Sequence, residues 1–180
     1  MRQLSLRQLI FMALCCDLGL FAKKLILPAA NLVTDALHIP GGIGTSFSLL
    51  FLVTAAFLLP GSFCATLMGT AQSVLALCFG TVGSMGALAP IGYIVPGAVI
   101  DLTRQAWRWG WLGLEESVLL SSVLASVAAA LSANFIVFRL WGPALWLYCA
   151  VAAASGGVCG MLAASLSKRL GPIVTGGAVS

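Results

Sequence analysis

The sequence predicts an all-α integral membrane protein, and two observations support this prediction. Of the 180 residues, 61% are hydrophobic and 8% are charged, whereas soluble globular proteins carry about 25% charged residues. From residue 36 to residue 100 the chain has no Asp, Glu, Lys or Arg, and about 20 apolar residues suffice to cross a bilayer as a helix. Long continuous apolar runs favour helices over the alternating strands of a membrane barrel.

Turn-forming residues divide the apolar sequence into six expected transmembrane helices. Pro28 is expected to end the first helix, and Pro40-Gly41-Gly42 precedes the second. Pro60-Gly61 separates the second helix from the third, and Gly83 to Gly86 separate the third from the fourth. Trp141-Gly142-Pro143 divides the fifth helix from the sixth. We expect a single membrane domain, residues 1–180, with a loose tail at 170–180. The expected spans are about 5–27, 43–60, 62–83, 87–104, 117–139 and 143–167.

Basic residues predict the orientation of these helices. An even number of crossings places both termini on one side of the membrane, and Lys and Arg are enriched on the cytoplasmic side. The side that holds the termini carries Arg2, Arg7, Arg104, Arg108, Lys168 and Arg169. The other side carries Lys23, Lys24 and Arg139. We therefore expect a multi-pass protein of the inner (cytoplasmic) membrane with both termini in the cytoplasm.

Polar and aromatic side chains gather in the outer half of the expected helices and in the outer loops. The candidates for substrate binding are Asn134, Tyr93, Tyr148, Trp146, His38, Asp35 and Gln72. An amide within a membrane span needs a hydrogen-bond partner and usually faces the bundle interior, and aromatic rings stack on planar ligands. Alternatives stay open, because Trp and Tyr also form interfacial belts, Asn134 can bond a neighbouring helix, and a loop histidine is often simply solvated.

Two acidic residues within the expected spans need partners. Asp17 lies in the middle of the first span, where a carboxylate that faces lipid is costly. It either pairs with Lys23 or Lys24 or faces a partner subunit. Asp101 lies near the inner end of the fourth span, three residues before Arg104, and this spacing predicts an ion pair.

Small residues recur every fourth position in the last two spans, at Ala125, Ala129 and Ala133 and then at Gly156, Gly160 and Ala164. Such faces let two helices approach closely in a membrane. They serve either packing within the bundle or contact with another membrane protein.

Motifs of the common enzyme classes are absent from the sequence, which has no GxSxG, HExxH, P-loop or dinucleotide-binding fingerprint. One histidine and five acidic residues leave few groups for acid–base chemistry. We expect no catalytic residue, metal ligand or cofactor in this chain. Basic residues are scattered at span ends, which indicates membrane orientation rather than nucleic-acid binding.

Four segments, in this order, resemble the substrate-binding S components of energy-coupling factor (ECF) vitamin transporters. They are HIPGGIGTSFSLLFLVTAAFL, MGTAQSVLAL, GTVGSMGALAPIGYIVPGAVIDL and SANFIVFRL. The resemblance covers about residues 6–168 and is to the hydroxymethylpyrimidine/thiamine or cobalt-type permease branch. It implies an S-component-like bundle that captures a water-soluble vitamin or precursor from outside. It also implies partnership with a transmembrane coupling subunit and two ATPase subunits, which would use the ATP.

The chain departs from this family pattern in three places. Members of this branch commonly have a histidine before the glycine of the third loop, where this chain has Met85, which implies a different ligand. S components often carry an Ala-xxx-Ala patch on the first helix to meet the coupling subunit, but here Ala13 is followed at that spacing by Asp17. Cobalt and nickel S components begin with a Met-His segment, whereas this chain begins Met-Arg-Gln. We therefore expect its ligand to be an aromatic heterocycle rather than a metal, and the best candidate is a thiamine-related hydroxymethylpyrimidine.

The candidates for partner docking are Ala13, Asp17, Ala129 and Gly160. A structural subunit of a larger membrane complex and a stand-alone secondary carrier are the alternative functions.

Overall fold

The computed structural model describes residues 6–36, 43–61, 63–80, 83–111, 113–139 and 141–174. All regular secondary structure in these ranges is helical, which confirms the expected all-α class. The helices are α1 (Leu6–Ala36), α2 (Ile43–Leu58), α3 (Cys64–Cys78), α4 (Ala89–Arg108), α5 (Leu114–Ala133) and α6 (Pro143–Val174). A 3-10 segment, η1 (Gly83–Leu88), precedes α4, and a π-helical turn, η2 (Asn134–Phe138), continues α5.

Three helical stretches are long and apolar enough to cross a membrane: Gly86–Arg108, Leu114–Phe138 and Pro143–Pro172. The helices α2 and α3 are also apolar but have 16 and 15 residues, or roughly 24 Å at a rise of about 1.5 Å per residue. That length is shorter than the hydrocarbon core of about 30 Å. Charged residues, Asp17, Lys23 and Lys24, interrupt the apolar sequence of α1.

The prediction that Pro28 ends the first helix is wrong, because Pro28 lies inside α1, which continues to Ala36. A proline removes one backbone hydrogen bond from a helix, and a helix in apolar surroundings keeps its remaining bonds because water is not there to replace them. Pro172 lies inside α6 in the same way. Residues 170–174 are therefore helical rather than part of the expected loose tail, and residues 175–180 lie outside the described part.

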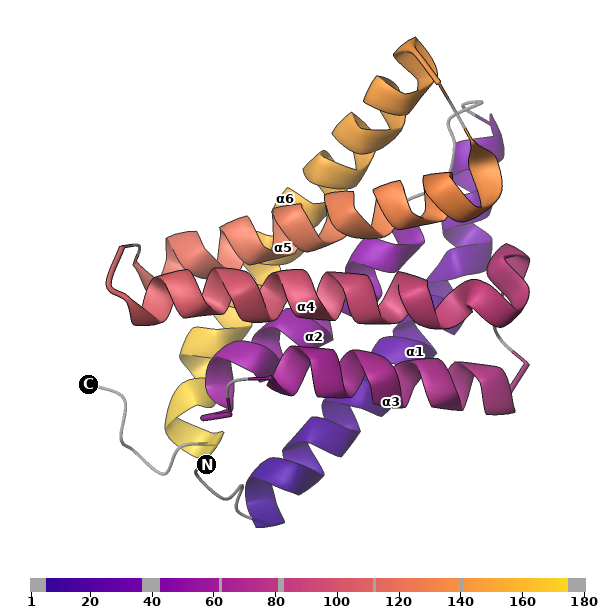
Figure 1. Cartoon of the computed structure of the whole chain (residues 1–180). Helices are drawn as coiled ribbons and strands as arrows, with labels where there is room; N and C mark the ends of the chain where they lie inside the picture. The colour runs from indigo at the N-terminus through magenta and orange to yellow at the C-terminus, as the bar shows by residue number, and fades with distance from the viewer. Residues whose placement is uncertain are drawn as a thin grey trace.

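The helices pack in a fixed order, with α4 between α3 and α5 and with α6 against both α5 and α2. Figure 1 shows α3, α4 and α5 side by side, with α1 and α6 crossing them obliquely. The helix α2 contacts each of the other five helices, and its residues 52–58 are all buried. The core of the bundle therefore forms around α2.

Side-chain polarity is inverted relative to a soluble protein. Serines of α2, α5 and α6 meet inside the bundle, where Ser46 Oγ lies 2.8 Å from Ser155 Oγ and donates to Ser126 Oγ over 3.2 Å. Many large apolar side chains are exposed instead, including Phe21, Leu102 and Phe135. A soluble monomer rarely exposes large contiguous apolar patches, and hydrogen bonds between polar side chains are a common contact between membrane helices. This distribution suits a bundle surrounded by lipid.

Glycines allow the closest helix crossings. A Cβ atom added to Gly69 of α3 would lie 2.5 Å from the carbonyl oxygen of Tyr93, and one added to Gly97 of α4 would lie 2.7 Å from that of Ala65. The backbones of α3 and α4 are thus in direct contact. At the α5–α6 crossing, a Cβ on Gly160 would lie 3.0 Å from the Cβ of Ser122.

Candidate functional site

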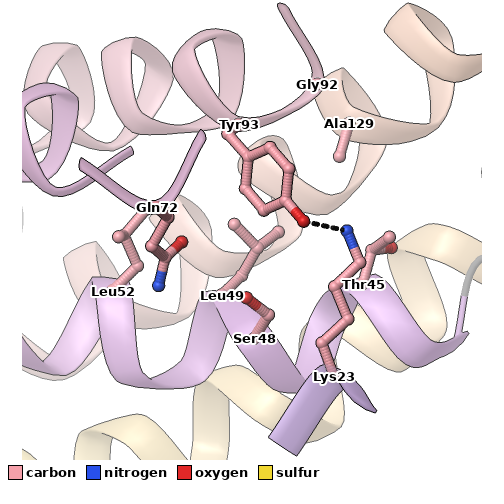
Figure 2. Close-up of a pocket in the computed structure, with 9 residues that line it drawn as sticks. All are labelled: Lys23, Thr45, Ser48, Leu49, Leu52, Gln72, Gly92, Tyr93 and Ala129. Atoms are coloured by element: carbon pink, nitrogen blue, oxygen red, sulfur yellow. Dashed lines mark hydrogen bonds between the residues drawn. The ribbon is translucent and has the colours of Figure 1, made fainter. Parts of the chain in front are cut away.

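A small polar pocket lies among the first five helices (Figure 2). The residues that line it are Lys23, Thr45, Ser48, Leu49, Leu52, Gln72, Gly92, Tyr93 and Ala129. Its free volume is about 20 Å³, which accommodates about one water molecule. In this conformation the side chains of the protein itself fill most of the space between the helices.

Lys23 of α1 and Tyr93 of α4 close the pocket against each other. Lys23 Nζ donates a hydrogen bond to Tyr93 Oη over 2.9 Å and lies 4.2 Å from the centre of the Tyr93 ring, close enough for a cation–π interaction. Figure 2 shows the two side chains reaching toward each other from opposite walls. Tyr93 is 9% exposed, so the amino group of Lys23 is held against a buried ring.

The helix α2 forms one wall of the pocket. Its lining residues Thr45, Ser48, Leu49 and Leu52 follow the spacing of three and four residues that places side chains on a single helix face. Figure 2 shows Thr45 beside Lys23 at one end of the pocket, Ser48 and Leu49 in the middle, and Leu52 beside Gln72 at the other end. Polar groups therefore lie along the whole length of the pocket.

Gln72 of α3 links the pocket to the backbone of α1. Its Nε2 donates to the carbonyl oxygen of Cys16 over 3.1 Å. This approach requires glycine at position 19, because a Cβ there would lie 2.6 Å from Gln72 Nε2. Gln72 is 2% exposed, so it both holds α1 against α3 and presents an amide to the pocket.

Of the residues expected to bind substrate, the structure brings Tyr93 and Gln72 together in this pocket. Tyr148 is buried elsewhere, between α5 and α6, where it packs on Ala130 and Ala152 and meets the edge of Phe138 with ring centres 5.8 Å apart. Asn134 is buried at the start of η2 and does not line the pocket.

Of the remaining three candidates, one is exposed on α6 and two have side chains outside the described part of the chain. Trp146 is 79% exposed on α6, which is the placement expected of an interfacial belt residue. Asp35 belongs to the last turn of α1, and its side chain, like the whole of His38, lies outside the described part of the chain.

The four candidates for partner docking separate into two pairs. Ala13 and Asp17 are exposed on α1. Ala129 lines the pocket and Gly160 lies buried at the α5–α6 crossing, so this second pair makes contacts within the bundle. Among the described side chains, Lys168 and Glu115 form an ion pair. The ion pair considered between Asp17 and Lys23 or Lys24 is not formed among these side chains.

The ion pair predicted between Asp101 and Arg104 is replaced by bonds from each residue to the backbone. Asp101 accepts hydrogen bonds from the amide of Ala65 at 3.2 Å and from Thr66 through both its amide, at 2.8 Å, and its hydroxyl, at 2.6 Å. Arg104 donates to the carbonyl oxygens of Leu59 and Gly61. The carboxylate thus caps the start of α3 and the guanidinium caps the end of α2, where the unpaired backbone groups of the helices favour these charges.

The sequence reasoning missed three polar pocket residues, Lys23, Thr45 and Ser48. Lys23 was missed because both Lys23 and Lys24 were interpreted as charges at a span end. Helical spacing distinguishes the two residues. Lys23 follows Cys16 and Gly19 at intervals of three and four residues, and these are buried positions of α1, whereas Lys24 is exposed. The small residues at 16 and 19 were the signal that this face of α1 packs inward.

The pocket offers one amino group, several hydroxyls, an amide and an aromatic ring, and the described residues of its lining include no His, Cys, Asp or Glu. These groups bind a polar solute through hydrogen bonds and charge. Comparison of the chain with protein-family models, curated proteins and solved structures finds no match.

Proposed function

We propose that this chain is a membrane-embedded solute-binding subunit of the ECF S-component type. In this proposal α1 to α6 each cross the inner membrane, with both termini in the cytoplasm. The pocket captures a small water-soluble vitamin or precursor from outside, and a coupling subunit with two ATPases supplies the energy for uptake.

The pocket around Lys23 is the observation that carries this proposal. The buried charges of Asp101 and Arg104 are bonded to other parts of the protein, whereas Lys23 lines a pocket, and an ionisable side chain within a membrane bundle is costly and usually marks a substrate or ion site. Thr45 lies in the first turn of α2, Tyr93 in the second turn of α4, and Ala129 about one turn before the end of α5. The pocket is therefore close to the end of the bundle that the basic residues assign to the external side.

The lining residues suit a single aromatic heterocycle, with hydroxymethylpyrimidine as the first candidate. The Tyr93 ring offers a stacking surface, and Gln72, Ser48 and Thr45 offer partners for ring nitrogens and exocyclic groups. A free volume of about 20 Å³ is too small for such a ring, since ligand pockets hold about 300 Å³ or more. Entry of the ligand must therefore separate Lys23 from Tyr93, and the flexible four-carbon stem of lysine allows this movement.

The exposed face of α1 is the proposed contact with the coupling subunit. It presents Leu14, Leu18 and Phe21 next to Asp17. An exposed carboxylate on a lipid-facing helix is costly, and a basic or hydrogen-bonding group on the partner would compensate it.

Equilibrium binding tests the proposal. We expect the purified protein in lipid nanodiscs to bind hydroxymethylpyrimidine or thiamine in isothermal titration calorimetry. Replacing Tyr93 with Leu removes the stacking ring and should weaken binding by roughly fivefold, because an aromatic contact is worth about 1 kcal/mol beyond its buried area. Trp146→Leu, at an exposed position of α6, is the control and should bind like the wild type.

Three outcomes would contradict this account. Binding that survives Tyr93→Leu but is lost in Tyr148→Leu would move the site to the α5–α6 end. A failure to bind any compound in a vitamin screen would favour a structural subunit. Uptake into liposomes that contain this protein alone, without an ATPase, would favour a stand-alone carrier.

A further inference from the structure

We propose that the solute bound in this pocket carries a carboxylate, and that this carboxylate replaces the Tyr93 hydroxyl as the partner of Lys23. This inference rests on the proposed solute-binding function. It selects acidic heterocycles over neutral ones, and therefore departs from hydroxymethylpyrimidine itself.

The charge around Lys23 is incompletely compensated. An ammonium group has three donor hydrogens, and the structure gives it the Tyr93 hydroxyl and the face of the Tyr93 ring. No carboxylate among the described side chains lies within ion-pair distance of Lys23. The neighbouring charged residues of α1, Asp17 and Lys24, are both exposed on that helix. Lys23 is half-buried, and a charge partly removed from water among apolar helices is stabilised most by a partner of opposite charge that also accepts its hydrogen bonds.

The position of the Tyr93 hydroxyl marks where an anionic oxygen would bind. It lies 2.9 Å from Lys23 Nζ, the usual separation of an ammonium and a carboxylate oxygen in a charge-assisted hydrogen bond. A tyrosine hydroxyl can both donate and accept. When a ligand oxygen takes over Lys23, the hydroxyl is therefore free to donate to the same carboxylate, and both protein groups keep a partner.

The net charge of the lining favours a monoanion. Lys23 is the one charged residue among the nine that line the pocket, so a carboxylate leaves the occupied site neutral. A phosphate dianion would leave one negative charge unpaired in the bundle, which is costly. The hydroxyls of Thr45 and Ser48 on the same wall can donate to the second carboxylate oxygen.

Matched pairs of ligands test this inference. In one pair, 4-amino-2-methylpyrimidine-5-carboxylate is compared with 4-amino-5-hydroxymethyl-2-methylpyrimidine, so the ring is constant and the acid is the variable. Nicotinate and nicotinamide form the second pair. We expect the wild-type protein in nanodiscs to bind the acid of at least one pair about tenfold or more tightly than its neutral partner, the gain typical of one charge-assisted hydrogen bond.

Two variants test whether Lys23 causes the preference for the acidic ligand. Lys23→Met keeps the length of the stem and removes the charge, so the preference for the acid should fall to about equal binding. Lys24→Met removes the neighbouring, exposed charge and should keep the preference, which makes it the matched control. Circular dichroism and the thermal unfolding midpoint of each variant show that both remain folded.

Each other result has a definite meaning. If the neutral compounds bind as well as the acids in the wild type, or if the preference survives Lys23→Met, the inference is overturned while the proposed binding function stands. If none of the four compounds binds at millimolar concentration, the inference is overturned, and the vitamin screen then decides the proposed function separately.

Discussion

Asp101 and Arg104, one turn apart on α4, hold the connection between α2 and α3 at both of its ends. The carboxylate of Asp101 accepts three hydrogen bonds at the start of α3, and Arg104 binds carbonyl oxygens beyond the end of α2. Two charges in the C-terminal half of α4, outside the lining of the pocket, thus fix how α2 and α3 enter the bundle. Both of these helices contribute lining residues to the pocket.

We predict that Asp101→Asn destabilises the protein. The amide has one acceptor oxygen in place of two and lacks the negative charge that favours the start of α3. Loss of these charge-assisted bonds should lower the free energy of unfolding by about 1–3 kcal/mol. Thermal unfolding of the purified variants in detergent measures the change, and Asp17→Asn, at an exposed position of α1, is the control. Equal unfolding midpoints for the two variants would contradict the capping role.

At the scale of single residues, the sequence identified part of the pocket. A polar or aromatic group within an apolar run is visible in the sequence, and this signal found Gln72 and Tyr93. It also selected Asn134, Tyr148 and Trp146, which the structure places outside the pocket. Asn134 and Tyr148 are buried, but in other parts of the bundle, so their depth was predicted and their location was not. Trp146 differs by rotation, because each residue turns a helix by about 100° and an error of one position in facing direction moves a side chain from the interior to the lipid. The packing of neighbouring helices sets that rotation.

At the scale of helices, apolar runs and turn residues located all six main elements. The starts of α2 and α6 agree with the expected boundaries, since Ile43 and Pro143 begin these helices. Local signals failed at Pro28 and Pro172, which lie inside helices. A proline opposes a helix by local sterics, but the surrounding apolar medium and packing favour continuation. The residues next to a proline do not show which of these two effects is larger at that position.

The close contacts between helices at glycine residues lead to a prediction about stability. We predict that Gly69→Ala separates α3 from α4, because the added Cβ would lie 2.5 Å from the backbone carbonyl oxygen of Tyr93 and a backbone atom cannot move aside as a flexible side chain can. The overpacking should cost about 1–3 kcal/mol of unfolding free energy, measured by thermal unfolding in detergent.

Gly157→Ala is the matched control on α6. Its added Cβ would meet Val123 Cγ2 at 4.0 Å, which is an ordinary contact, and alanine favours a helix over glycine by about 1 kcal/mol. This variant should be as stable as the wild type or more so. If Gly69→Ala were equally stable, the close contact between α3 and α4 would be wrong.

At the scale of the whole molecule, two features support the proposal: polar side chains inside the bundle with apolar ones outside, and a different placement of charged residues at its two ends. Buried serines bind one another while leucines and phenylalanines are exposed, and the exposed ion pair between Lys168 and Glu115 lies near the start of α5 and the end of α6. The pocket lies toward the opposite end of the bundle. In the proposed arrangement of six crossings with cytoplasmic termini, that pocket would lie near the external surface, where a solute can reach it.

Labelling of single introduced cysteines in intact cells tests this arrangement most directly. Phe79, Trp111 and Trp141 follow α3, α4 and η2 respectively and are 73%, 76% and 86% exposed, so each is changed to Cys in a background with the exposed Cys78 replaced by Ala. With six crossings, a membrane-impermeant maleimide should label positions 79 and 141 from outside and label position 111 only after the cells are permeabilised. Labelling of position 111 from outside, or of positions 79 and 141 on opposite sides, would contradict the six crossings and the external pocket.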